Sequence, residues 1–292
     1  MGKIKVKCIG DNMILELVKF AIYSGLIVLI SKYILVTNLR KLAENLNLKP
    51  KTVGNISGFA TSIPELITIS ISSFSGLLNA SIFNILSSNI INFLQYVISI
   101  ISNKNVKKLN NKAIKIDIFL VIITILIPIL IVLLNIDMNV VFIPIFIVLY
   151  VIFKTLNNRF HKLYLESEDE MINDIIQKEE EKLENKQLKN TVKYVLIILM
   201  TGILLFVVGE LLSSVIENLA ELFKISQFLI GVLLGIVTSI PEFITFFESQ
   251  RHYRNNVDNS ILGVVEATNN LFTSNILNLF VIQSIGIFIY LF

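Results

Sequence analysis

The chain has 292 residues, of which 54% are hydrophobic and 16% are charged, and its formal net charge is +3. A soluble domain carries about 25% charged residues, so the composition excludes an ordinary soluble protein and indicates a polytopic helical membrane protein. The single cysteine, Cys8, excludes an internal disulfide framework. Nothing resembles a phosphate loop, a nucleophile elbow or a basic nucleic-acid patch, so we expect neither an enzyme nor a nucleic-acid partner.

Eight apolar segments are long enough to cross a bilayer, which takes roughly 20 apolar residues in a helix. The lengths of these apolar segments predict an all-α fold with about eight transmembrane helices. The last segment is too short for two crossings at about 1.5 Å per residue, so we expect one long helix or a span with an apolar tail. The predicted spans are 14–36, 50–73, 78–101, 116–135, 139–156, 192–217, 227–248 and 260–282.

Basic residues concentrate in alternate connections between these spans. The connections after the second and fourth spans contain no Lys or Arg, and the one after the sixth contains only Lys224. The positive-inside rule therefore places the basic connections in the cytoplasm and both termini outside, although three lysines near the N-terminus count mildly against this. The basic residues in question are Arg40, Lys41, Lys49, Lys51, Lys104, Lys107, Lys108, Lys112, Lys115, Arg251 and Arg254.

A polar motif in the second span occurs again in the seventh. Thr-Ser-Ile-Pro-Glu stands at residues 61–65 and, 177 positions later, at residues 238–242. The same shift superimposes two glycines on two glycines, and after nine extra residues a second polar stripe also matches. The two spans cross in opposite directions, so the sequence predicts two repeats of inverted topology, as in many secondary transporters. The matched pairs are Gly54 and Gly231, Gly58 and Gly235, Asn84 and Asn270, Ser88 and Ser274, and Asn92 and Asn278.

The repeated motif gathers oxygen atoms on one helical face. Thr61 and Ser62 lie one turn before Glu65, and Pro64 removes a backbone donor, which leaves a carbonyl oxygen without its helical partner. A charge at the bilayer centre costs at least about 2.5–3.5 kcal/mol, so two symmetric glutamates need a compensating role. Hard oxygen ligands favour a calcium site between Glu65 and Glu242. The alternative is that these carboxylates, and the serines and asparagines near them, only hold helices together. The four glycines are better explained by close helix packing than by contact with an ion.

Other charged positions have no counterpart in the opposite repeat. Residues 157–190 form a charged cytoplasmic linker, which we interpret as a solvated helix, with a calcium-sensing acidic patch as the alternative. Glu266 is either a ligand on the access path or an interfacial residue, and Glu210 is either a proton site or a helix contact. His161 and His252 fall in predicted loops without the spacing of metal ligands.

The repeats resemble the cation/calcium exchanger superfamily, whose motifs read approximately G-T-S-L-P-E-L and G-N-x-x-G-S-N-I-x-N. The chain has A-T-S-I-P-E-L at 60–66, V-T-S-I-P-E-F at 237–243, F-N-I-L-S-S-N-I-I-N at 83–92 and N-N-L-F-T-S-N-I-L-N at 269–278. The resemblance implies an integral membrane antiporter, expected in the plasma membrane, that exchanges Ca²⁺ for Na⁺ or H⁺ by alternating access and needs no cofactor. The implied ion ligands are Glu65, Glu242, Thr61, Thr238, Ser62, Ser239, Ser88, Asn92, Ser274 and Asn278.

The chain departs from the family pattern in length and in the second half-motif. Family members usually have ten or more spans, so we expect a first repeat of five spans in 1–156, the linker 157–190, and a truncated second repeat of three spans in 191–292. The second repeat is expected to lack the last two spans of the family pattern, and a homodimer would cover the surface that they would otherwise occupy. Both stripe asparagines stay Asn where many members carry one Asp. Family glycines are replaced by Phe83, Ser87, Asn269 and Thr273. A membrane scaffold or regulatory subunit that kept the repeats without transport is the alternative function.

Overall fold

The computed structural model describes residues 2–46, 48–74, 76–164, 189–223, 226–253 and 260–292. These ranges contain helices and no strand, as the composition predicts. Three elements are not α-helical: η1 and η3 are π-helical turns and η2 is a 3₁₀-helix. The elements are α1 (Gly2–Ile30), η1 (Ser31–Val36), α2 (Thr37–Asn45), α3 (Pro50–Thr61), α4 (Ile63–Phe74), α5 (Leu78–Ser102), η2 (Val106–Asn110), α6 (Lys112–Leu133), α7 (Phe142–Tyr164), α9 (Lys189–Phe223), α10 (Gln227–Thr238), α11 (Ile240–His252), α12 (Ser260–Ile276), η3 (Leu277–Ile282) and α13 (Gln283–Leu291).

Eight crossings emerge from these elements. Within the described residues, seven helical stretches are long and apolar enough to cross a membrane. The pair α3 and α4 supplies the eighth predicted crossing, interrupted at Ser62. From Ser260 to Leu291 the chain is one continuous helix through α12, η3 and α13, so of the two alternatives for the last segment the structure has the single long helix.

The fifth crossing is longer than predicted. The polar residues after position 156 predict the end of this span there, but α7 continues to Tyr164. Two of the polar residues, Asn157 and His161, are buried, and both contact the buried Asp117 of α6. The helix therefore continues because its polar residues have partners on α6. The middle of the predicted linker, residues 165–188, lies outside the described residues.

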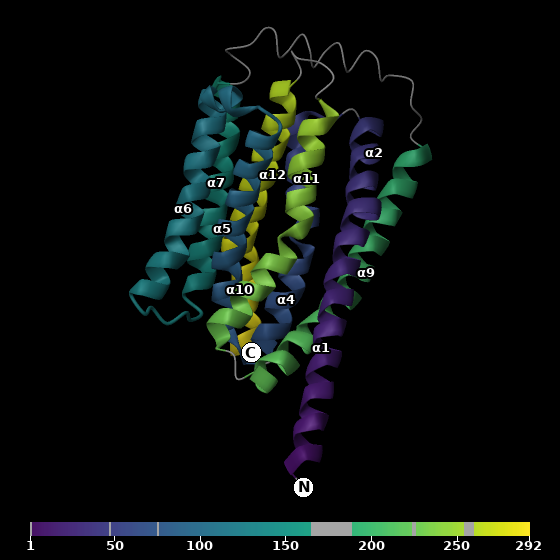
Figure 1. Cartoon of the computed structure of the whole chain (residues 1–292). Helices are drawn as coiled ribbons and strands as arrows, with labels where there is room; N and C mark the ends of the chain where they lie inside the picture. The colour runs from purple at the N-terminus through teal and green to yellow at the C-terminus, as the bar shows by residue number, and fades with distance from the viewer. Residues whose placement is uncertain (1, 47, 75, 165–188, 224–225, 254–259) are drawn as a thin grey trace.

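The basic connections lie together at one end of the molecule, which we call the basic end (residues 40–46, 48–51, 103–115 and 251–253); Arg254 lies outside the described residues. Figure 1 shows the tops of α2, α11 and α12 at this end and both chain termini at the other. The side chain of Asn105 donates a hydrogen bond of 3.0 Å to Gln250 Oε1, which joins the connection before α6 to the end of α11. The alternation of basic connections along the sequence therefore corresponds to two distinct ends of the bundle.

The two repeats pack in the same way with their roles exchanged. Helix α3 crosses α12, and its repeat counterpart α10 crosses α5. A Cβ atom added to Gly54 would lie 2.9 Å from the Asn269 Cβ, and one added to Gly231 would lie 2.6 Å from the Phe83 Cβ. Real Cβ atoms do not approach so closely, so both crossings need glycine. The packing role predicted for these glycines is confirmed.

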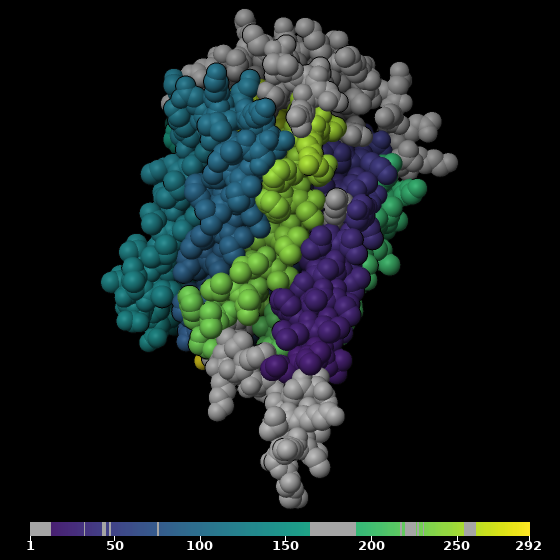
Figure 2. Space-filling view, in the orientation of Figure 1, coloured from purple at the N-terminus to yellow at the C-terminus, as the bar shows by residue number. Residues whose placement is uncertain are grey.

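The four central elements are flanked by two outer pairs. Helix α9 packs against α1 and α4 on one side, and α6 and α7 pack against α12 and η3 on the other. Figure 2 shows the α1–α2 crossing beside α10 and α11 on the near face. This arrangement encloses the two interrupted crossings, α3–α4 and α10–α11, together with α5 and α12.

Candidate cation site

Both interrupted helices break at the serine of the repeated motif. Ser62 has φ −82° and ψ 2°, and Ser239 has φ −79° and ψ 0°, so the two breaks share one backbone geometry. The proline two residues later has no N–H to offer the carbonyl one turn back. The break that the motif predicts is confirmed. Each half-helix that follows carries its glutamate, Glu65 or Glu242, in the first turn, where the helix dipole favours a negative charge.

All ten residues of the predicted site are buried, and none is more than 2% exposed. Hydrogen bonds join several of them across different helices. The Ser62 and Ser274 hydroxyl oxygens are 3.0 Å apart. Ser274 donates to Glu242 Oε1 at 3.0 Å, and Asn92 Nδ2 donates to Ser274 Oγ at 3.4 Å. Residues from α3–α4, α5, α11 and α12 therefore meet at one point.

The two carboxylates face this point together. Glu65 and Glu242 are close enough for their charges to repel each other, and the Thr238 hydroxyl lies beside the Glu65 carboxylate. The Thr61 hydroxyl lies beside Glu242 in the equivalent way. Each threonine donates its proton to the carbonyl one turn back, to Ser57 O at 2.9 Å or to Leu234 O at 3.0 Å. The threonine oxygens therefore present lone pairs to the carboxylates.

Several buried oxygens at this point accept no hydrogen bond. A buried polar atom without a partner costs roughly 1–3 kcal/mol, and proteins seldom leave several together. The side-chain nitrogens of Asn92 and Asn278 donate hydrogen bonds to neighbouring residues, whereas their side-chain oxygens accept none. A cation needs oxygen atoms with lone pairs that no hydrogen-bond donor occupies, so these residues fit Ca²⁺ or Na⁺. The atoms without a partner are Glu65 Oε1 and Oε2, Glu242 Oε2, Asn92 Oδ1, Asn278 Oδ1, Asn270 Oδ1 and Ser239 Oγ.

Asn89 and Asn275 form a brace that the sequence analysis did not include among the site residues. Asn89 Nδ2 donates to the Asn275 carbonyl at 3.3 Å, and Asn275 Nδ2 donates to the Asn89 carbonyl at 3.2 Å. Asn275 Oδ1 accepts a hydrogen bond from Asn92 Nδ2 at 3.3 Å, and Asn89 Oδ1 accepts one from Asn278 Nδ2 at 3.4 Å. Because the side-chain amide groups of Asn92 and Asn278 donate to this brace, the orientation of their side-chain oxygens is fixed. The signal in the sequence was that this pair is itself matched between the repeats.

The rest of the polar stripe braces the broken helices. Asn84 Nδ2 donates to Thr68 Oγ1, and its repeat counterpart Asn270 donates to Thr245 Oγ1. Ser88 donates to Asn84 Oδ1 at 3.2 Å. Asn278 lies in the π-helical turn η3, a type of distortion that is frequent at functional sites.

Three charged or titratable residues singled out in the sequence lie elsewhere. Glu266 is buried, but its carboxylate is held by Arg40. Glu210 is exposed on α9 and does not belong to the buried site. His161 does not lie in a loop as predicted: it is buried in α7, and its Nε2 is 2.6 Å from Asp117 Oδ2. Within the described ranges, no three His, Cys, Asp or Glu side chains lie close enough together to hold one metal ion, so no third carboxylate joins Glu65 and Glu242.

Comparison with known proteins connects this architecture to a transporter family. The sequence model described as "Sodium/calcium exchanger protein" matches residues 17–157 and 193–291. Two structures of the sodium-calcium exchanger NCX_Mj each cover 95% of this chain and 83% of their own. One, soaked with 10 mM Na⁺ and zero Ca²⁺, is 21% identical with a TM-score of 0.55. The other, soaked with 100 mM Na⁺ and 10 mM Sr²⁺, is 19% identical with a TM-score of 0.56. No curated protein matches the chain.

The family match includes both copies of the repeated motif and all ten residues of the predicted site. The structural match extends over nearly the whole chain and agrees with an all-helical, polytopic fold. The chain is therefore an integral membrane protein of the sodium/calcium exchanger family.

Proposed function

We propose that this protein is an antiporter that exchanges Ca²⁺ for Na⁺ or H⁺ by alternating access at a site between Glu65 and Glu242, near the membrane midplane. The observation that carries the proposal is the set of seven buried oxygens without a hydrogen-bond partner, which includes both carboxylates. Six of these atoms are carboxylate or amide oxygens, which only accept, and the seventh is the Ser239 hydroxyl; a hard cation is the ligand that would satisfy their lone pairs together.

The proposed ligands divide by chemistry. Glu65 and Glu242 would supply the negative charge, and the threonines of the two breaks would supply neutral oxygens. The remaining residues would complete the calcium site and adjoining sodium sites: Thr61, Thr238, Ser62, Ser239, Ser88, Asn92, Ser274 and Asn278.

Charge balance limits the coupling ion. Two carboxylates are neutralised by one Ca²⁺ or by two protons, whereas three Na⁺ would leave one excess positive charge in a site of low dielectric constant. The balance therefore favours exchange for protons or for fewer than three Na⁺. Because the site is buried, it must open to one side at a time, which is what exchange without leakage requires.

Uptake of ⁴⁵Ca²⁺ by liposomes that contain the purified protein tests the proposal. A Na⁺ gradient, a pH gradient and no gradient are imposed in parallel on vesicles loaded with identical buffer. With an antiporter, either the Na⁺ gradient or the pH gradient drives accumulation of ⁴⁵Ca²⁺, and accumulation stops when an ionophore collapses that gradient. If uptake stays at the level of empty liposomes under all three conditions, the membrane scaffold is favoured instead. Detection of the protein in separated plasma-membrane and internal-membrane fractions of cells would test the expected plasma-membrane location.

A further inference from the structure

A buried ion pair crosses the molecule near the basic end. Arg40 of α2 holds the Glu266 carboxylate of α12 with two hydrogen bonds, of 2.8 and 2.7 Å, one to each oxygen. Ser249 of α11 donates to the same carboxylate at 2.6 Å. The Glu266 side chain is 1% exposed and that of Arg40 is 18% exposed. Three elements that are separate in the sequence are thus held together through one carboxylate.

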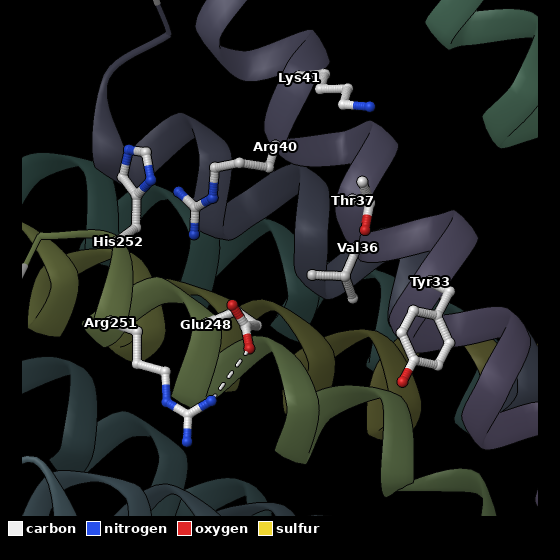
Figure 3. Close-up of a pocket in the computed structure, with 8 residues that line it drawn as sticks. All are labelled: Tyr33, Val36, Thr37, Arg40, Lys41, Glu248, Arg251 and His252. Atoms are coloured by element: carbon white, nitrogen blue, oxygen red, sulfur yellow. Dashed lines mark ion pairs between the residues drawn. The ribbon is translucent and has the colours of Figure 1, made fainter.

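This ion pair lies between the solvent and the cation site. On its outer side is a cleft of about 510 Å³ between α2 and α11. Figure 3 shows Arg40 reaching into this cleft from α2, opposite Glu248, Arg251 and His252. On its inner side is a second cavity, of about 10 Å³, which Arg40 and Glu266 also line.

The inner cavity borders residues that are hydrogen-bonded to the site. Its lining includes Ser57 and Thr245. The Ser57 carbonyl accepts the Thr61 hydroxyl, and Thr245 accepts from Asn270, one of the residues with an oxygen left over. A cavity needs roughly 10–15 Å³ of such space for a single water, so a hydrated ion cannot pass here. Val36 and Arg40 line both the outer cleft and the inner cavity, and Arg40 is the one that holds the Glu266 carboxylate there.

The ion pair is present in one repeat and missing from the other. The repeat relation that brings Asn270 onto Asn84 brings Glu266 onto Ala80, and Ala80 carries no charge. The surroundings are otherwise equivalent: Gly54 packs on the Glu266 backbone as Gly231 packs on that of Ala80. An ion-coordinating role would call for the same oxygen in both halves, so the asymmetry indicates a task that belongs to one end only.

We propose that Arg40 and Glu266 form a gate that closes the approach to the cation site from the basic end, with Ser249 positioning the carboxylate. This inference rests on the proposed function for its purpose, because a closed approach matters only if an ion uses it. To open, α2 must separate from α11 and α12, which breaks the pair. Removal of one partner leaves the other charge buried without its counter-charge, and that favours the separated arrangement.

Accessibility of a cysteine behind the gate tests the proposal without any transport measurement. In a Cys8→Ser background, Ser57→Cys places a thiol in the inner cavity, and a cationic methanethiosulfonate reagent is applied to the basic end of sealed vesicles. We expect Arg40→Gln and Glu266→Gln to raise the labelling rate by about tenfold or more, which corresponds to 1.4 kcal/mol or more of lost closure. The exchanged pair Arg40→Glu with Glu266→Arg should restore slow labelling.

The matched control is a second ion pair on the same cleft. Arg251 and Glu248 are 3.5 Å apart, and their side chains are 60% and 41% exposed, so Arg251→Gln should leave the labelling rate within about twofold of the parent. Equal rates in Arg40→Gln, Glu266→Gln and the parent would overturn the gate, as would equal acceleration by Arg251→Gln.

A milder variant covers the chance that the glutamine variants do not fold. Arg40→Lys keeps the charge but loses one of the two hydrogen bonds, and it should label at an intermediate rate. Parallel ⁴⁵Ca²⁺ flux separates the two proposals. Faster labelling in a protein without flux keeps the gate and rejects the antiporter. Unchanged labelling in a protein with flux rejects the gate and keeps the antiporter.

Discussion

Glu65 is the residue in which burial and lack of partners are most pronounced, because both its carboxylate oxygens are buried and accept no hydrogen bond. We therefore expect Glu65→Gln to raise the melting temperature in the presence of a calcium chelator by about 2–4 °C, equivalent to roughly 1 kcal/mol. The fraction that stays monodisperse after heating measures this. A lower melting temperature would mean that the carboxylate stabilises the fold rather than binding an ion.

The stripe asparagines predict a milder effect. Asn92→Ala removes a neutral oxygen and a donor to Ser274 and Asn275, so the apparent calcium affinity of flux should fall by up to about tenfold while the rate at saturating calcium is retained. Asn278→Ala should behave alike. Asn110→Ala, at an exposed position that accepts from Lys115, is the control and should change nothing. Loss of the saturated rate in Asn92→Ala would assign it a larger role than a neutral ligand.

At the scale of residues, the duplication predicted much of what the structure gathers. The motif residues Thr61, Ser62 and Glu65 and their counterparts are buried together, although their role as ligands stays a prediction. The match between the repeats singles out Asn89 and Asn275, but their contact could not be predicted, because it depends on the register of α5 against α12, helices that are 186 residues apart at this contact. The partner of Glu266 was unpredictable for the same reason, since Arg40 is 226 residues away.

Among the elements, the two crossings α3–α12 and α10–α5 depend on glycine. Gly54→Ala and Gly231→Ala would each push a Cβ into the facing helix, and we expect a loss of about 1–3 kcal/mol of stability, seen as a lower melting temperature. The control is Gly25→Ala in α1, where a Cβ would meet nothing within 4 Å and the helix propensity of alanine should stabilise by up to about 1 kcal/mol. Equal behaviour of all three variants would show that these crossings tolerate wider spacing.

The helices themselves could be predicted where apolar length and proline decide them. The two breaks followed from Pro64 and Pro241. The length of the last segment excluded two crossings but left one long helix and a span with an apolar tail both open. The π-helical turn η3 could not be predicted, because no proline or glycine marks Leu277–Ile282. The end of α7 was predicted too early, because polarity alone does not reveal that Asn157 and His161 have a buried partner in Asp117.

For the whole molecule, the separation of its two ends predicts a labelling pattern. A cysteine at Asp137, between α6 and α7, should react with an impermeant thiol reagent added to intact cells. A cysteine at Lys107, at the basic end, should react only after the membrane is permeabilised. Both are exposed, so reactivity reports the side of the membrane and not burial. Reaction of both from the same side would contradict the inverted repeats.

The number of crossings and the relation of the repeats could be predicted from the sequence, because apolar runs and a duplicated motif survive without tertiary information. The homodimer stays a prediction, since apolar side chains on the outer helices are what a lipid-facing surface and an interface have in common. Light scattering of the protein in detergent would decide it.

Equilibrium binding of ⁴⁵Ca²⁺ to the purified chain tests the central claim most directly, because it needs neither orientation nor coupling. The account predicts one Ca²⁺ per chain for the parent and for Glu248→Gln, whose carboxylate is 41% exposed at the rim of the outer cleft. At the same calcium concentration, Glu65→Gln and Glu242→Gln should bind none, since each leaves a single carboxylate in the site. Binding by either variant with the stoichiometry and affinity of the parent would contradict a calcium site between Glu65 and Glu242.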